Sequence, residues 1–449
     1  MKIYLESLGC ARNQVDSEIM IGRLKKAGLN LTDDPAEAET IVVNTCSFIE
    51  DAAQESIDVI LELAEYKKEG TCSRLIVAGC LPERYREDIL QSLPEVDVFL
   101  GTGAFDQIVK AVGEPHFFHQ CLLPDPDLIA DEGNDSPRDL ISPHLAYIKV
   151  AEGCSKTCTY CIIPKLRGRQ KSRPPEDIIS EASRLMTAGV KEFVLVAQDT
   201  TAYGKDLKTP VNLSSLIGDL ALLGAGEQWG NAKPWFRVLY GHPESIEDSF
   251  IDTVASHPNL CPYFDIPIQH VSPTVLKRMG RRYNRDELYR LFDRIRNLVP
   301  TAVLRTTVIV GFPGESDKDF DQLLKFAEDV QFDHLGVFIY SDSDDLVSHN
   351  LPDHVPGAVA TDRYHQLMSA QSGISSENNQ KYVGKTLKVL VEESLENHLF
   401  AGRTNFQAPE VDGISYINTD QSPFKLKIGR FADMRVTDAM EYDLMGVLV

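Results

Sequence analysis

The sequence predicts an α/β protein with three folded parts. These are an N-terminal doubly wound parallel sheet, a central incomplete (β/α)6 barrel and a small antiparallel β-barrel at the C-terminal end. Three observations predict them: strands and helices alternate over residues 1–118, six further strand-helix units fill residues 142–380, and short strands broken by glycines occupy residues 381–449. A chain of 449 residues is also long enough for about three domains.

The first domain alternates strand patterns with helical patterns. The predicted strands are Ile3–Leu5, Thr40–Cys46, Leu75–Ala78 and Val96–Leu100, and the helical patterns end at Gly28, cover residues 50–68 and cover residues 105–112. Alternation of this kind is typical of a doubly wound parallel sheet. The carboxyl ends of its strands share one edge of the sheet, and ligands bind at that edge.

Three cysteines of the first domain stand at this edge. Cys10, Cys46 and Cys80 each follow a successive predicted strand, so the fold brings them together although they are far apart in sequence. One such cysteine alone is more often an ordinary core residue. Three at equivalent positions instead predict an iron-sulfur cluster site with three protein ligands and one iron left open.

Residues 119–141 are predicted to form an extended linker. Acidic residues and prolines are frequent at 123–127 and 131–137, and large apolar residues are few. Cys121 lies at the start of this linker and is given no role.

The central domain repeats a strand and a helix six times. The predicted strands are Ala146–Val150, Phe193–Ala197, Trp235–Tyr240, Tyr263–Ile266, Leu304–Val310 and Leu335–Tyr340. Six parallel units form an incomplete version of the eight-unit barrel, in which functional residues collect in the loops after the strands.

The loop after the first barrel strand carries three more cysteines. Cys154, Cys158 and Cys161 lie within eight positions, which predicts a loop wrapped around a group that thiolates bind. A structural zinc site needs a fourth Cys or His, yet none stands within ten residues after Cys161, and the nearest upstream histidine is His144. Three thiolates on a cubane cluster instead leave one iron open for a substrate or cofactor.

Two further loops are expected to point toward the barrel mouth. Gly311 and Gly314 follow the fifth strand and let the backbone approach a ligand closely, and Glu315 is expected to open the next helix. Gln198 and Asp199 follow the second strand. A loop turn or a helix cap is an equal alternative for these two residues.

The C-terminal part consists of short strands. The predicted strands are Leu387–Glu392, Glu410–Ile417 and Lys425–Ile428, and four glycines interrupt them. Short strands separated by glycines are typical of a small antiparallel barrel.

The amino-acid composition and net charge restrict the classes of function that the protein can have. The apolar content of 43% and charged content of 25% are those of a globular protein, and no apolar run approaches the roughly 20 residues of a membrane span. We therefore expect a cytoplasmic protein without a membrane partner, whose nine cysteines are reduced and available as ligands. The net charge of −22 disfavours generic nucleic-acid binding and favours basic partners.

Several of these motifs resemble one known family. The spacing C-x3-C-x2-C, with Tyr160 directly before the last cysteine, resembles the signature of radical S-adenosylmethionine (SAM) enzymes, and the C-terminal part resembles the TRAM domain. The order of the three parts resembles the methylthiotransferase family. The resemblance implies domains at 1–118, 142–380 and 381–449, joined by the linker 119–141.

The resemblance also implies the cofactors and their ligands. Cys154, Cys158 and Cys161 would hold a 4Fe-4S cluster that binds and cleaves SAM, and Cys10, Cys46 and Cys80 would hold a second 4Fe-4S cluster that carries the sulfur to be inserted. Five residues would contact SAM: Tyr160, Gln198, Asp199, Gly311 and Gly314. Each turnover would consume two SAM molecules and would require an external electron donor and a sulfur donor. No catalytic side chain is predicted beyond the cluster ligands.

The family has two branches, which modify an adenosine in transfer RNA or an aspartate in the small-subunit ribosomal protein numbered twelve. The segments 197–204, 239–243 and 408–413 resemble the ribosomal branch, whereas residues 340–346 depart from its pattern and leave that loop's shape open. An acidic enzyme suits a basic ribosomal protein, free or within the ribosomal subunit. The alternatives are a transfer RNA adenosine methylthiotransferase and, outside the enzymes, an iron-sulfur or zinc RNA-binding module.

Overall fold

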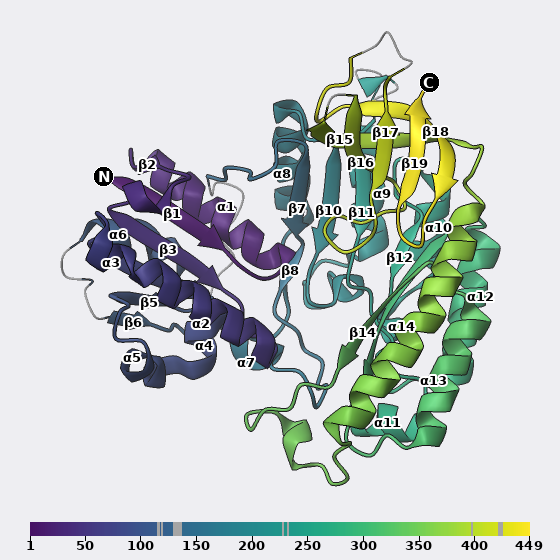
Figure 1. Ribbon diagram of the computed structural model, residues 1–449, viewed down its shortest axis with the longest axis horizontal. Helices are drawn as coiled ribbons and strands as arrows, with labels where there is room; N and C mark the ends of the chain where they lie inside the picture. Colours follow the sequence, from purple (N-terminus) through teal and green to yellow (C-terminus); the bar gives the residue numbers. More distant parts are fainter. Residues whose placement is uncertain are drawn as a thin grey trace.

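A computed structural model describes residues 1–114, 117, 120–128, 137–226, 229–230, 233–396, 398–420 and 425–449. Its three parts are distinct in Figure 1: the N-terminal sheet domain lies to the left, the barrel to the right, and the C-terminal strand barrel on top. Residues 129–136, the middle of the predicted acidic linker, lie outside the described residues.

The N-terminal domain is a six-stranded parallel sheet in the order β2-β1-β3-β4-β5-β6. Its strands are β1 Lys2–Ser7, β2 Asn30–Leu31, β3 Thr40–Thr45, β4 Arg74–Gly79, β5 Val98–Leu100 and β6 Gln120–Leu122. Its helices are α1 Ala11–Lys26, α2 Glu50–Ala64, α3 Tyr66–Glu69, α4 Cys80–Tyr85, α5 Ile89–Ser92 and α6 Ile108–Gly113. The predicted doubly wound sheet is confirmed. The short edge strands β2 and β6 were not predicted, and Cys121 belongs to β6 rather than to a free linker.

Alternate residues of β3 explain why helices cover both faces of this sheet. Ile41 and Val43 pack in one cluster with residues of α2, whereas Val42 packs on the other face with residues of α1 and α6. A strand buried on both faces is continuously apolar, which is the pattern seen at residues 41–43.

The central domain is an open barrel of six parallel strands. They form two sheets, β11-β10-β7 and β12-β13-β14, and the backbone N–H of Cys261 joins them by donating to the carbonyl of Phe236 at 2.8 Å. The strands are β7 Leu145–Lys149, β10 Glu192–Val196, β11 Trp235–Val238, β12 Tyr263–Asp265, β13 Val303–Val310 and β14 His334–Ile339. The predicted incomplete (β/α)6 barrel is confirmed.

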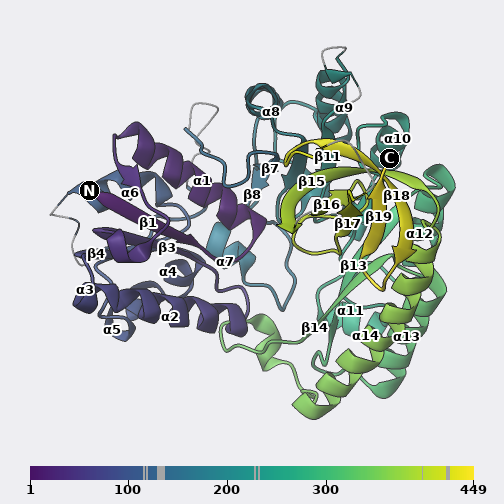
Figure 2. The same ribbon diagram turned by 45° about the horizontal axis from the view of Figure 1, so that its top comes forward.

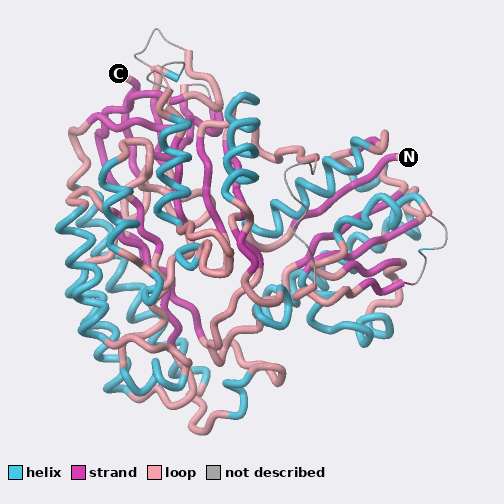
Figure 3. The backbone as a smooth tube through the Cα atoms, turned by 180° about the vertical axis from the view of Figure 1, so that it is seen from behind, coloured by secondary structure: helices cyan, strands magenta, loops and turns pink. Residues whose placement is uncertain are grey.

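Long helices cover the outside of this barrel, as Figure 3 shows from behind. They are α8 Pro175–Ala188, α9 Leu213–Gly224, α10 Asp248–Ser256, α12 Arg285–Leu298, α13 Asp317–Val330 and α14 Gly357–Gln380. Four short elements lie within the connections between the barrel strands and the long helices: β8 Ala151–Glu152, α7 Ile163–Arg167, β9 Lys171–Ser172 and α11 Pro273–Arg278. The long helices pack on Phe193 and Leu195 of β10, while Val194 and Val196 face the barrel interior.

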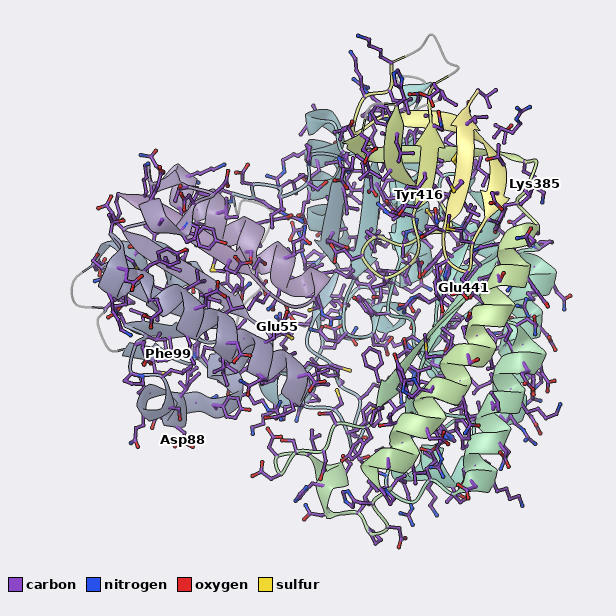
Figure 4. The ribbon with its side chains drawn as sticks, viewed as in Figure 1. Glu55, Asp88, Phe99, Lys385, Tyr416 and Glu441 are labelled. Atoms are coloured by element: carbon purple, nitrogen blue, oxygen red, sulfur yellow. The ribbon has the colours of Figure 1, made fainter. Side chains whose placement is uncertain are left out.

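The C-terminal domain fills part of that interior. It is a closed barrel in the order β15-β16-β17-β19-β18, and its core residues join one cluster with the inward residues of β7, β10 and β12. Its strands are β15 Thr386–Glu396, β16 Leu399–Thr404, β17 Ser415–Asn418, β18 Phe431–Ala439 and β19 Leu444–Leu448. Figure 2 shows this domain over the barrel strands. Side chains also join it to α14: the Ser372 hydroxyl donates to Glu441 at 2.7 Å, and Figure 4 labels Glu441 beside this helix.

The predicted small barrel is confirmed, two of its three predicted strands need correction, and β16, β18 and β19 were not predicted. Residues 425–428 are not a strand, because β18 begins only at Phe431, after Gly429 turns the chain with φ of +76°. The predicted strand Glu410–Ile417 is reduced to Ser415–Asn418, since residues 408–413 form a loop. One pair, β17 with β19, is parallel rather than antiparallel.

A buried chain of charges joins the barrel to the C-terminal domain. The carboxylate of Glu192 accepts from Nε of Arg237 at 2.8 Å and from Arg403 at 2.7 Å. Arg403 also donates from Nε to Glu392 at 2.9 Å, and His144 approaches Glu392 at 3.6 Å. Removing one member would leave an opposite charge buried and unpaired, which is costly.

Glu392 makes this interface sensitive to acid. Burial raises its pKa, but the nearby His144 and the hydrogen bonds and positive charge of Arg403 outweigh burial and lower the pKa to about 2. Since the folded pKa lies below the unfolded value of about 4.3, the stabilisation is complete above that value and is lost as pH falls toward 2. We expect Glu392→Gln to lower the free energy of unfolding at pH 7 by up to about 3 kcal/mol, and to lower the Tm accordingly.

Thermal unfolding between pH 7 and pH 3 checks this prediction. The gap in Tm between the wild type and Glu392→Gln should narrow as pH falls, because acid removes the same charge from the wild type. Glu393→Gln is the matched control, because Glu393 is the next residue in the chain and its side chain is exposed. A gap that does not change with pH would contradict the prediction.

Candidate active site

A cavity of about 360 Å³ lies at the carboxyl ends of the barrel strands. All three domains line it: Arg12 and Phe48 come from the N-terminal sheet domain, Val411 comes from the C-terminal domain, and the remaining residues come from the barrel. Cys154, Cys158 and Cys161 all line this cavity. The loop of the first barrel strand therefore faces a cavity that residues of the two neighbouring domains also line.

Backbone contacts fix the shape of this cysteine loop. The N–H of Cys154 donates to the carbonyl of Gly168 at 3.0 Å, and the N–H of Thr159 donates to the carbonyl of Met279 at 3.1 Å. Gly153 has φ of +77°, and a Cβ there would lie 2.2 Å from the carbonyl oxygen of Arg169. The loop is thus held by its backbone, which leaves its thiols available as ligands.

Burial affects the thiols of the loop. It raises the pKa of Cys154 and raises that of Cys161 to about 12, with the neighbouring cysteines adding to the effect. Such thiols ionise only beside a strong positive charge, as metal ions provide when they bind thiolates. Within the described residues, no three His, Cys, Asp or Glu side chains are grouped to hold one metal ion. The donor set that the loop offers is three thiols, and a four-iron cluster binds each of its thiolate ligands at a separate iron, so the donor set suits such a cluster.

The N-terminal cysteines all lie at the carboxyl edge of their sheet. Cys10 precedes α1, Cys46 follows β3, and Cys80 opens α4. Gly9 has φ of +91°, and a Cβ there would lie 3.2 Å from Sγ of Cys46, so the loop of Cys10 touches Cys46. Burial and then the charges of Cys46 and Cys10 raise the pKa of Cys80 to about 12, although Arg167 opposes them.

Arg167 connects this edge to the barrel, and the sequence analysis did not identify it. Its guanidinium donates to Asn13 at 2.6 Å and to Sγ of Cys80 at 3.7 Å, and it pairs with Asp16 at 3.2 Å and with Glu152 at 3.1 Å. The residue stands on α7, directly after the cysteine loop. Its buried positive charge lies between Cys80 of the N-terminal domain and Glu152 of β8.

Three of the predicted SAM-contacting residues line the cavity. Gln198 donates to Glu152 at 2.8 Å, while its buried Oε1 has no hydrogen-bond partner among the described residues. Asp199 caps the short helix Thr200–Ala202, so the helix-cap alternative applies to it, although it also lines the cavity. The hydroxyl of Tyr160 accepts from Nε of Arg281 at 3.1 Å.

The two predicted glycines do not line this cavity. Gly311 has φ of +76°, and a Cβ there would collide with the Ala360 side chain at 2.4 Å. A Cβ on Gly314 would lie 2.2 Å from the guanidinium of Arg278. Both glycines therefore permit close packing within the protein, and their contact with SAM stays a prediction.

Glu315 does not open the next helix as expected. Ser316 caps α13, and the Glu315 carboxylate instead accepts from the backbone N–H groups of Gly311 and Phe312. Burial raises the pKa of Glu315 to about 7, although Arg363 opposes the shift. Its role is to hold the turn after β13 in shape.

The loop 408–413 of the C-terminal domain reaches into the barrel. The hydroxyl of Tyr263 donates to Asp412 at 2.6 Å, and Arg305 and His334 each approach the same carboxylate at 3.5 Å. Because Asp412 is almost completely buried, this loop closes the cavity wall that Val411 lines. In sequence, residues 408–413 are distinguished only by a family resemblance, and these contacts are not predictable from it.

Asp412→Asn is expected to lower the free energy of unfolding by about 3 kcal/mol, because it leaves the buried cation Arg305 with Asp265 as its remaining carboxylate partner. Urea unfolding followed by circular dichroism measures the change. Asp433→Asn is the control, since Asp433 is exposed on β18 and should change stability by no more than about 0.5 kcal/mol. Equal stability of the two variants would show that Asp412 does not hold the domains together.

Three family models match successive parts of the chain. An uncharacterised protein family, UPF0004, matches residues 2–101, the radical SAM superfamily matches residues 148–327, and the TRAM domain matches residues 383–449. The solved structure of the radical SAM methyltransferase TsrM from Kitasatospora setae, with tryptophan and a SAM analogue bound, has a similar fold. Its TM-score is 0.57 at 12% identity, and the match covers 83% of this chain and 89% of that chain.

The barrel, its cysteine loop and the matched superfamily define a radical SAM enzyme. Curated relatives refine this class. The ribosomal protein uS12 methylthiotransferase RimO of Desulfosudis oleivorans is 52% identical over 449 residues, covering 99% of both chains, and that of Clostridioides difficile is 47% identical over 448 residues, covering 99% of this chain and 98% of the relative. The chain belongs to the RimO family of radical SAM methylthiotransferases.

Proposed function

We propose that this enzyme transfers a methylthio group to the β-carbon of a specific aspartate in ribosomal protein uS12. The single observation that carries the proposal is the shared cavity, which is lined by Cys154, Cys158 and Cys161 and by Arg12 and Phe48, neighbours of the N-terminal cysteines. The relatives named as uS12 methylthiotransferases match over the full chain, which supports this substrate over transfer RNA or a non-enzymatic role.

A radical SAM methylthiotransferase uses an iron-sulfur cluster and SAM. We assign one 4Fe-4S cluster to Cys154, Cys158 and Cys161 and a second to Cys10, Cys46 and Cys80. The bound cofactors supply the radical chemistry that breaks an unactivated C–H bond, which acid-base side chains cannot do. The chain itself orients the substrate, holds the ligand loops and keeps water away from the cavity.

Three apolar side chains support a macromolecular substrate. Phe48, Phe338 and Val411 belong to the three different domains, line the cavity, and are each roughly half exposed. A protein bound over them would bury their apolar surface and close the cavity to water. We propose the domain division 1–118, 119–141, 142–380 and 381–449, in which each of the three folded parts contains one of these residues.

The net charge of −22 supports a basic partner such as a ribosomal protein, either free or within the small subunit. No helix of the described residues is long and apolar enough to cross a membrane. The reaction further requires an external electron donor, a sulfur donor and two SAM molecules per turnover. We place the enzyme in the cytoplasm, where ribosomal protein is available.

Mass spectrometry of a strain lacking this gene tests the proposal. Ribosomal protein uS12 from that strain should lack the methylthio mass, and expression of the gene should restore it. Nucleosides from the same cells provide the comparison. If uS12 keeps its modification while a transfer RNA adenosine loses a methylthio group, the transfer RNA alternative replaces the proposal.

A further inference from the structure

Four cationic side chains line the cavity: Arg12, Lys156, Arg281 and Arg305. Two of them already have carboxylate partners, since Lys156 pairs with Glu244 at 3.2 Å and Arg305 pairs with Asp265 at 3.1 Å. Among the described residues, Arg12 and Arg281 form no ion pair with a carboxylate within 4.0 Å. Two guanidinium groups thus remain for incoming anions.

These two groups lie on different sides of the cavity. Arg281 donates to Tyr160 and approaches Nε2 of His242 at 2.6 Å, so it belongs with the cysteine loop of the barrel. Arg12 stands in the first turn of α1, two positions after Cys10, and belongs with the N-terminal cysteines. In Figure 1 this end of α1 points toward the barrel.

The guanidinium of Arg12 is held in place, but not all of its hydrogen-bond donors have an acceptor among the described residues. One nitrogen donates to the carbonyl of Ala197 at 2.8 Å, and the group lies over the ring of Tyr240 at 4.7 Å from its centroid. Its Nε is buried and has no hydrogen-bond partner within the described part of the chain. A buried donor without a partner is costly unless a ligand supplies the acceptor.

The position of Tyr240, whose ring lies under the guanidinium of Arg12, is also fixed by hydrogen bonds. The N–H of Tyr240 donates to Asp265 at 2.9 Å, and its carbonyl accepts from Thr200 at 3.0 Å. Tyr240 has φ of +62°, which is uncommon for a residue other than glycine and is seen where surrounding contacts enforce it. Arg12 is therefore preorganised, and a planar guanidinium is well suited to bind a carboxylate.

We propose that Arg12 binds the side-chain carboxylate of the substrate aspartate and thereby selects aspartate for modification. The inference rests on the proposed function. The β-carbon of an aspartate is bonded directly to its carboxylate carbon, so a carboxylate held by Arg12 places the reacting carbon in the cavity beside the N-terminal cysteines. Arg12 acts as a specificity-determining residue.

A double-mutant cycle of binding tests this role without turnover. The full-length reconstituted enzyme, as wild type and as Arg12→Gln, is titrated without reductant with uS12 and with uS12 whose modified aspartate is replaced by asparagine. For the wild type, the asparagine substitution should weaken binding by roughly 10- to 100-fold. Arg12→Gln should bind both proteins equally, because the partner of the carboxylate is gone.

Two further variants separate specificity from other effects. Lys26→Gln removes the same charge from an exposed position on α1 and should retain full discrimination between aspartate and asparagine. Arg12→Lys keeps the charge and should retain part of the discrimination between aspartate and asparagine. Lys26→Gln should also leave iron content and the uncoupled release of 5′-deoxyadenosine unchanged, because Lys26 lies outside the cavity lining.

The outcomes are distinct. If the wild type modifies uS12 but Arg12→Gln discriminates as well as the wild type, this inference is wrong and the proposed function stands. If Arg12→Gln loses iron and Arg12→Lys restores it without any change in discrimination, Arg12 only balances thiolate charge and the inference is again wrong. If the wild type does not modify uS12, the proposed function fails, and the inference fails with it.

Discussion

Cys158→Ala is expected to reduce the cleavage of SAM to below detection. Cys158 is the middle cysteine of the loop 154–161, all three cysteines of this loop line the cavity, and a cluster with only two protein ligands is poorly held. Anaerobic incubation with SAM and a strong reductant, followed by chromatography of 5′-deoxyadenosine, measures the effect. Iron content should fall by about half if each cysteine triad holds one cluster.

Cys261→Ala is the matched control for Cys158→Ala. Cys261 is buried between β11 and β12 and packs in an apolar cluster. Its loss should leave iron content unchanged and cost about 1 kcal/mol of stability. Cys72 and Cys121 should be dispensable for iron in the same way. Normal SAM cleavage by Cys158→Ala would remove the barrel loop from the mechanism.

Cys46→Ala is expected to abolish methylthiolation while it preserves SAM cleavage. Cys46 belongs to the N-terminal sheet, and the contacts that fix the barrel loop come from Gly168 and Met279, which this substitution does not touch. The two activities are measured on one preparation: 5′-deoxyadenosine by chromatography and modified uS12 by mass spectrometry.

The comparison of Cys46→Ala with Cys158→Ala is the decisive one. Loss of both activities in both variants would show that the two triads form one interdependent site. Cys72→Ala provides the control within the same sheet domain, because Cys72 is buried in the apolar cluster that also contains Leu75. Its iron content and both activities should match the wild type.

The loop 340–346 shows how the domains are held together near Cys46. Its sequence departs from the family pattern, and the sequence left its shape open. In the structure, Asp345 pairs with the buried Arg84 at 3.0 Å, and Arg84 also donates to the carbonyl of Ser47 at 2.7 Å. These contacts join the barrel loop to the segment after Cys46.

Local patterns were enough to predict the three folds and both cysteine triads. Strand and helix periodicity, such as the apolar run 40–43, reflects neighbours along the chain, and the position of a residue after a strand follows directly from it. The spacing of Cys154, Cys158 and Cys161 is likewise local. The failed strand at 425–428 shows the limit, because a short pattern next to Gly429 does not decide whether a partner strand is available.

The tertiary structure alone determined which cationic and acidic residues share the cavity. Arg12 meets Ala197 and Tyr240, and Asp412 meets Tyr263 and Arg305, only because separately folded domains dock on the barrel. No periodicity or spacing encodes such contacts, since they depend on the relative placement of domains far apart in sequence. The sequence thus specified the two cysteine triads that we propose as cluster ligands, while domain docking determined the cavity and the residues that we propose select its substrate.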